Sequence, residues 1–202
     1  MFKNLGLQEY FYIGYIYLII LGIISDAIFY GILGVPYLNY VTILDALISP
    51  ISLLTNNWKL TLFLALVFIF MYYYITRWSF KLYKIFKVKK WYQKIYNIEK
   101  LDKIYKDIEE KRNLVQAMLL MFFIMFIAMR LGMGLGIRNK IQTKEVIPNY
   151  TITFKDDSVK EIKLIGQNSS YVFYIEKDDK IIAITPIVDN LKQIKRIPKK
   201  ES

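Results

Sequence analysis

Two opposite charges, Asp26 and Arg130, lie inside otherwise apolar stretches, and they are the residues best placed to do chemistry there. Burying either charge near the centre of a bilayer costs roughly 2.5 to 3.5 kcal/mol on insertion scales, so each needs a partner. Asp26 lies sixteen residues after Tyr10 and Arg130 sixteen residues after Leu114, the starts of their apolar segments. If both segments run in the same direction, the two charges lie at similar depth. We expect them to form an ion pair that joins the segments.

A second interpretation leaves these two charges apart. Arg130 then extends its side chain to the outer headgroups, and Asp26 caps a helix break near Gly31 and Gly34.

Residue types that are missing exclude most familiar active sites. The 202 residues include no Cys and no His, so the chain has no disulfide, thiol nucleophile, thiolate or imidazole metal ligand, or Ser-His-Asp triad. The carboxylates, Lys, Arg, Tyr, Ser and Thr that remain form no cluster with the spacing of a known mechanism. We therefore expect no catalytic residue, no metal site and no cofactor.

A stripe of polar residues runs through the apolar segment 36–55, which Pro36 and Pro50 interrupt. Steps of three or four residues place the stripe on one side of a helix, which predicts an amphipathic helix that lies in the interface or re-enters the bilayer. We expect this helix to pack on the lipid surface. The functional alternative is a stripe that lines a pore or faces a ligand, and the structural alternative is a fourth, imperfect span. The stripe consists of Asn39, Thr42, Asp45, Ser49 and Ser52.

The connector 79–112 begins with a lysine-rich stretch that has aromatic residues between its cations and no acidic residue before Glu99. Anionic headgroups attract each such cation by about 1 kcal/mol, and aromatic rings favour the same interface. Similar interleaving occurs in nucleic-acid binding, but the neighbouring apolar segments already hold this stretch against lipid, so we expect anionic headgroups as partners and no nucleic acid. The expected headgroup ligands are Lys81, Lys84, Lys87, Lys89, Lys90 and Lys94.

Three segments are long and apolar enough to position these groups in a membrane. The chain is 55% hydrophobic with mean hydropathy +0.29, too apolar for an ordinary soluble domain of its size. A spanning helix needs about 20 mostly apolar residues, which predicts spans near 10–34, 58–78 and 114–137. The first segment could instead be a cleaved signal peptide, but only Lys3 precedes it and no clean cleavage site follows.

Charge asymmetry predicts the orientation. Residues 77 to 112 hold twelve Lys or Arg against five Asp or Glu, so this connector should be cytoplasmic. The N-terminus is then cytoplasmic as well, and the residues after the third span are extracytoplasmic. The basic residues just after Ile137 oppose this assignment.

Gly132, Gly134 and Gly136 occupy alternate positions at the end of the third span. We expect them to stop the helix, so that 138–147 forms a flexible neck. A close helix contact is the alternative, although glycines two residues apart do not share a helix face.

The pattern changes to strand-like alternation in 148–202. β-rich runs are separated by short Asp, Asn, Gly and Ser turns, which predicts an antiparallel meander of four strands, with a fifth strand at LKQIKRI. At the level of pattern, five strands in about fifty residues resemble small SH3-like or Sm-like barrels. Tyr171, Phe173 and Ile175 alternate with Val172 and Tyr174, so this strand should be central; an exposed aromatic groove on one face is the alternative.

The sequence therefore predicts a membrane domain over 1–137 that consists of three transmembrane helices and an interfacial or re-entrant helix. A small C-terminal antiparallel β domain follows it. We expect an integral protein of the cytoplasmic membrane that acts as a non-enzymatic anchor or adaptor, with a β domain that contacts a protein partner, the envelope or another copy. The alternative function is a subunit of an oligomeric channel or transport accessory, with Asp26 and Arg130 in the membrane. An enzyme is the third class.

Overall fold

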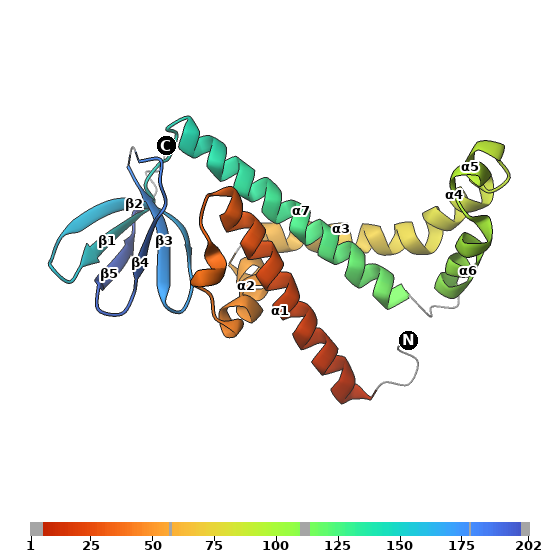
Figure 1. The fold of residues 1–202 in the computed structure, drawn as a ribbon, viewed down its shortest axis with the longest axis horizontal. Helices are drawn as coiled ribbons and strands as arrows, with labels where there is room; N and C mark the ends of the chain where they lie inside the picture. The colour runs from red at the N-terminus through yellow and green to blue at the C-terminus, as the bar shows by residue number, and fades with distance from the viewer. Residues whose placement is uncertain (1–5, 57, 110–113, 178, 199–202) are drawn as a thin grey trace. The chain divides into compact units, whose positions relative to one another are not determined.

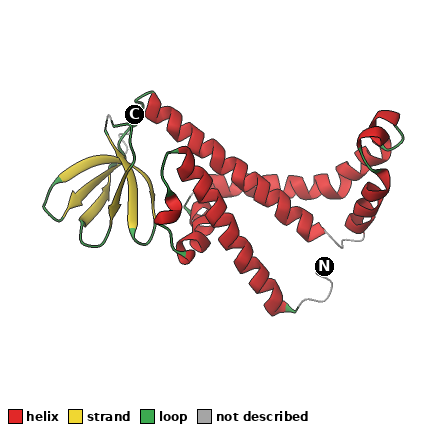
Figure 2. Cartoon of the chain, in the orientation of Figure 1, coloured by secondary structure: helices red, strands yellow, loops and turns green. Residues whose placement is uncertain are grey.

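A computed structural model describes residues 6–56, 58–109, 114–177 and 179–198. The chain is mostly helical and ends in a five-stranded antiparallel sheet, as predicted (Figures 1 and 2). Three helical stretches are long and apolar enough to cross a membrane: Leu7–Ile32, Trp58–Phe86 and Leu114–Gln142. The chain divides into two compact units, and the second unit combines Ile16–Pro50 with Ile127–Ser202.

The second apolar helix is longer than the predicted span. Helix α3 (Trp58–Tyr73) begins at the predicted residue, continues through a π-helical segment, η2 (Tyr74–Trp78), and ends as α4 (Ser79–Phe86). The hydroxyl groups of Thr76 and Ser79 donate to the carbonyls of Tyr72 and Ile75, at 2.7 and 2.8 Å. Hydrogen bonding to carbonyls of the preceding turn is a known cause of local helix bending, so η2 is a natural place for the helix to change direction.

The third apolar helix does not stop at its glycines. Helix α7 (Leu114–Gln142) passes through Gly134 to residue 142, so the expected helix stop is wrong and the first five residues of the expected neck are helical. The reason is a close contact with helix α1 (Leu7–Ile32): a Cβ on Gly134 would lie 3.2 Å from the Phe29 carbonyl oxygen and 3.0 Å from Ile32 Cδ1. A glycine here lets the two helices approach, as in packed membrane helices.

The connector is a set of short helices. After α4 the chain forms α5 (Lys90–Ile95) and α6 (Ile98–Glu109), and Asn97 lies between these two helices. The Asn97 side-chain oxygen accepts a hydrogen bond from the Lys100 amide at 3.0 Å, a typical N-cap. The Tyr83 ring stacks on the Tyr105 ring at 4.3 Å between centroids, so α6 packs against α4. The last residues of the connector, 110–112, lie outside the described residues.

The five strands form one sheet in the order β4-β3-β2-β1-β5. The strands are β1 (Tyr150–Phe154), β2 (Val159–Gln167), β3 (Tyr171–Glu176), β4 (Ala183–Pro186) and β5 (Leu191–Arg196). Adjacent strands pair antiparallel throughout. The turn between β1 and β2 forms because Asp156 Oδ1 accepts a hydrogen bond from the Ser158 amide at 3.0 Å, while Asp157 takes a left-handed φ of 63°.

Strand β3 lies between β2 and β4, and both of its faces are buried. One face adds Val172 and Tyr174 to a core with Ile152 and Ile162. The other face presents Phe173 to residues from the end of α1 and the segment that follows it. Phe173 is therefore covered by the end of α1 and the segment after it, and the alternative of an exposed aromatic groove is wrong at Phe173.

Candidate functional site

The second unit contains a buried ion pair between helices α1 and α7. Arg130 Nη2 donates to Asp26 Oδ1, and the two residues are only 7% and 2% exposed. The guanidinium carbon lies 4.0 Å from the centre of the Phe29 ring, a cation–π contact that covers one side of the charge. Among the described residues, Arg130 Nε has no hydrogen-bond partner. The two charges thus neutralise each other in an apolar setting.

Polar side chains from the segment after α1 surround the Asp26 carboxylate. Ser49 of helix α2 (Ile43–Thr55) and Tyr37 of the 3-10 helix η1 (Tyr37–Asn39) interact with it. Burial, together with the negative charge of Asp26, raises the pKa of Tyr37, so its hydroxyl stays protonated and can donate. Helix α2 comes close to α1 because Gly22 has no side chain; a Cβ there would lie 1.8 Å from the Ala46 carbonyl oxygen.

A second set of hydrogen bonds fixes the same segment to the β2–β3 turn. The carboxylate of Asp45 accepts from the Ser169 amide at 2.9 Å and from the Ser169 hydroxyl at 3.1 Å. It also accepts from the Thr42 hydroxyl at 2.7 Å, which holds the start of α2. The Asn168 side chain donates to the Tyr40 carbonyl at 2.8 Å. The contacts of Asp45 with Ser169 and of Asn168 with Tyr40 join residues 124 and 128 positions apart in the chain.

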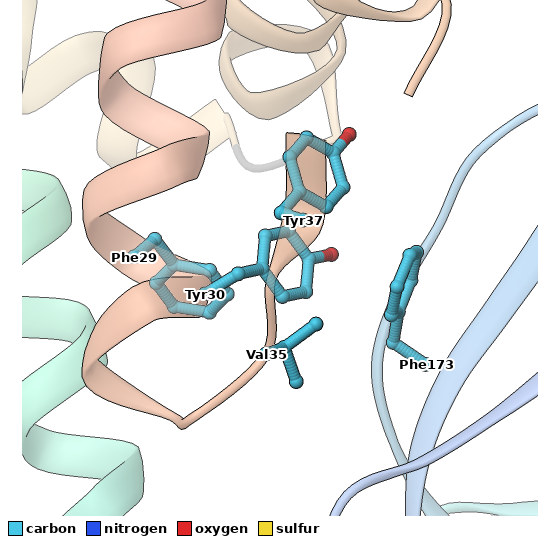
Figure 3. Close-up of a cluster of buried hydrophobic side chains, with 5 residues drawn as sticks. All are labelled: Phe29, Tyr30, Val35, Tyr37 and Phe173. Carbon is cyan, nitrogen blue, oxygen red and sulfur yellow. The ribbon is translucent and has the colours of Figure 1, made fainter. Parts of the chain in front are cut away.

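Aromatic rings complete the contact between helices and sheet (Figure 3). We call this contact, of the end of α1, η1 and α2 with β2, β3 and the turn between them, the junction. The Tyr30 and Tyr37 rings stack with centroids 4.3 Å apart, and the Phe173 ring lies 4.8 Å from Tyr30. Phe29 and Val35 belong to the same buried cluster. Gly166 on β2 lies directly against Tyr30, since a Cβ there would be 2.0 Å from the tyrosine hydroxyl oxygen. The sheet is therefore packed on the end of α1 through several close contacts.

Only part of the predicted polar stripe reaches this junction. Thr42, Asp45 and Ser49 take part in it, whereas Asn39 is exposed. Ser52 accepts a hydrogen bond from the Asn56 side chain at 3.0 Å. Helix α2 and the residue before it thus direct these three polar groups toward other residues of the second unit and leave apolar side chains exposed. The exposed large apolar residues of this segment are Leu38, Ile43, Leu44, Ile48 and Ile51.

The predicted headgroup ligands lie on α4, on α5 and in the turn between these two helices. All are exposed except Lys87, which is half-buried and pairs with Asp102 at 3.3 Å. Three of these lysines also lie over aromatic rings: Lys84 over Phe80, Lys87 over Tyr83 and Lys89 over Phe86.

Sequence patterns do not single out several residues of the junction, chiefly Tyr37, Gly166 and Ser169. Helical periodicity indicates which residues share the α2 stripe, but no local pattern connects Asp45 with a serine in a distant turn. The one usable signal is β3 itself: a strand with apolar residues on both faces needs a second covering surface.

The junction joins parts of the second unit through an ion pair, hydrogen bonds and ring contacts. Asp26 is occupied by Arg130, and the described part of the chain contains no cluster of three or more carboxylates that could hold a metal. No family model matches the chain, and neither the curated proteins nor the solved structures searched contain a match.

Replacing Asp45 by Asn is expected to weaken the attachment of α2 to the β2–β3 turn by about 1 to 2 kcal/mol, since bonds to a charged acceptor are lost. Burial raises the pKa of Asp45, but hydrogen bonds from Thr42 and Ser169 outweigh it and lower the pKa. The contribution is therefore complete above the carboxyl's unfolded pKa near 4 and is lost as pH falls through the lower folded value. Thermal unfolding in detergent from pH 6 to pH 3 measures this loss.

A second variant, Glu161→Gln, is the control for this prediction. Asp45→Asn should flatten the acid limb of the stability curve, while the exposed Glu161→Gln on β2 should leave it in place. An unchanged acid limb in Asp45→Asn would show that this carboxylate contributes nothing.

Gly166→Ala is expected to destabilise the junction by about 1 to 3 kcal/mol, because the added methyl overlaps the Tyr30 hydroxyl and that ring is held between its aromatic neighbours. Removing the hydroxyl with Tyr30→Phe should return part of this stability in the double variant. Gly136→Ala on α7 is the control, since nothing lies within 4 Å of its Cβ position. Equal stability of Gly166→Ala and Gly136→Ala would contradict the packing of β2 on α1.

Proposed function

We propose that this chain is a multi-pass membrane protein that holds its β domain against the outer end of two membrane helices and acts as a non-enzymatic anchor or adaptor. The observation that carries the proposal is the polarity of the second unit. In its helices the charges of Asp26 and Arg130 face each other and the Asp45 carboxylate faces Ser169, whereas large apolar side chains such as Ile20 and Leu135 are exposed. Such an arrangement is stable where lipid surrounds the helices.

The direction of the helices supports three crossings. Asp26 contacts Arg130, and the later residues Phe29 and Ile32 flank the later Gly134, so α1 and α7 run parallel. Two parallel spans require an odd number of crossings between them, and α3 supplies one. If α2 also crossed, α1 and α7 would run antiparallel. The parallel arrangement therefore supports an interfacial or re-entrant α2, and the lysine-rich connector supports a cytoplasmic N-terminus.

The adaptor role rests on the β domain. Its order, with β1 between β2 and β5, is the order of a small SH3-like barrel, and we propose that class for it. Because Phe173 and Tyr171 face the chain's own aromatic residues, partners would bind elsewhere, on the edge strands β4 and β5. A domain fixed to its anchor presents such an edge at a constant distance from the membrane.

The channel alternative has less support. It needs Asp26 and Arg130 to face a lumen, whereas both are buried against each other inside one unit.

Purification of the full chain in mild detergent tests the proposal. We expect resistance to alkaline carbonate extraction, a stoichiometric protein partner or a defined homo-oligomer, and no ion flux in reconstituted liposomes. Charge reversal at Lys195 and Arg196, two exposed residues of β5, should release the partner, while reversal at Lys180 should not. Ion conduction, or recovery as a detergent-free aqueous monomer, would overturn the proposal.

A further inference from the structure

The turn from α4 into α5 exposes an unusual number of large apolar side chains. Val88 and Ile95 are 74% and 67% exposed, and the others are more than one third exposed. A hairpin that extends into water would place these groups inward. We call residues 78–95 the elbow, and its exposed apolar residues are Trp78, Leu82, Ile85, Val88, Trp91 and Ile95.

The elbow also carries a strong positive charge. Six lysines lie between residues 79 and 98, with no Asp or Glu among them. Lys84 Nζ lies 4.4 Å from the centre of the Phe80 ring and Lys89 Nζ lies 5.0 Å from that of Phe86, so the cations are distributed among the aromatic side chains. Apolar groups with interleaved lysines match an anionic lipid surface, which offers hydrocarbon and phosphate within one layer.

The other side of the elbow is packed against α6. The Tyr83 ring stacks on the Tyr105 ring, and the Tyr83 hydroxyl donates to the Ile98 carbonyl at 3.4 Å. The ion pair between Lys87 and Asp102 lies on this packed side. Helix α6 therefore covers one side of the elbow and leaves exposed Trp78, at the end of η2, and Leu82 and Ile85 of α4. These three residues follow helical spacing, so they form one stripe.

We infer that the elbow lies on the anionic leaflet at the inner end of α3, with its apolar stripe in the boundary between headgroups and acyl chains and its exposed lysines, all but Lys87, at the phosphates. The π-helical segment Tyr74–Trp78 is the point where the helix can turn from crossing the bilayer to lying along it. This inference rests on the proposed membrane insertion and adds a second, peripheral attachment that the spans themselves do not require.

Tryptophan quenching in nanodiscs tests the inference on the full chain, which has three tryptophans. One variant keeps only Trp91 (Trp58→Phe with Trp78→Phe), and a second keeps only Trp58 (Trp78→Phe with Trp91→Phe). Both are placed in phosphatidylglycerol discs whose lipids carry bromine at the start of the acyl chains. We expect the emission of Trp91 to be quenched as strongly as that of Trp58. Its emission maximum should lie at a shorter wavelength than that of a tryptophan in water.

The lysines are tested in the Trp91 variant. Lys90→Gln with Lys94→Gln should reduce quenching, while Lys100→Gln with Lys103→Gln on α6 removes the same charge and should leave it unchanged. Equal effects of the two pairs would refute the role of the elbow lysines.

The two possible failures differ. Quenching of Trp58 without quenching of Trp91 would overturn the inference and leave the membrane proposal intact; an elbow that binds an acidic protein instead would give this result. Quenching of neither tryptophan would mean that the membrane proposal itself fails.

Discussion

Arg130→Met is expected to lower the free energy of unfolding by about 3 to 5 kcal/mol, because it leaves the Asp26 carboxylate buried without its partner. Asp26 is only 2% exposed, so water cannot replace the guanidinium without opening the packing of α1 on α7. Denaturant titration in mixed micelles measures the loss. Arg138→Met is the matched control: the residue lies on the same helix but is exposed, and its replacement should change stability little.

The double variant Asp26→Leu with Arg130→Met separates pairing from independent burial of two charges. Well-packed apolar residues can replace a buried ion pair at little cost, so the double variant should recover most of the loss. A double variant that loses the sum of the two single losses would show that the groups contribute separately. The Arg130 side chain would then be stabilised by other groups, such as the Phe29 ring.

Gly22→Ala is expected to cost about 3 kcal/mol, at the upper end of overpacking effects. Its Cβ would lie 1.8 Å from the Ala46 carbonyl oxygen and 2.7 Å from the carbonyl carbon, so backbone would have to move. The movement would pull Ser49 from Asp26 and Asp45 from Ser169, because both residues are on α2. Unfolding in detergent and protection of the Ser169 amide from hydrogen exchange would both report it.

Gly14→Ala provides the control for this prediction. Gly14 is on the same helix with nothing within 4 Å of its Cβ position, so alanine there should be neutral or should stabilise through helix propensity. If Gly22→Ala and Gly14→Ala were equally stable, the close contact of α1 with α2 would be refuted.

Periodicity predicts much of the architecture. The apolar lengths place all three long helices, and alternation with polar turns gives the five strands. Asp26 and Arg130 occupy equal positions in their apolar segments. Because the rise per residue of a helix is constant, equal positions predict equal depth in two parallel helices. The structure brings these two side chains into contact.

Long-range packing accounts for the features of the structure that sequence patterns do not predict. Glycines have low helix propensity, yet Gly134 is helical because the contact with Phe29 and Ile32 outweighs that preference. Asn97 ends one helix and caps the next, and the connector therefore forms separate helices. The bonds from Asp45 to Ser169 depend on where the sheet lies against α1, and no local pattern encodes that placement.

Labelling of single cysteines is the most direct test of the central claim, that the connector and the β domain lie on opposite sides of a membrane. The chain has no cysteine of its own, so Lys106→Cys on α6 and Lys180→Cys between β3 and β4 each introduce one unique site. A membrane-impermeant maleimide should label Lys180→Cys in intact cells and Lys106→Cys only after permeabilisation. Labelling of both sites under the same condition would contradict the account.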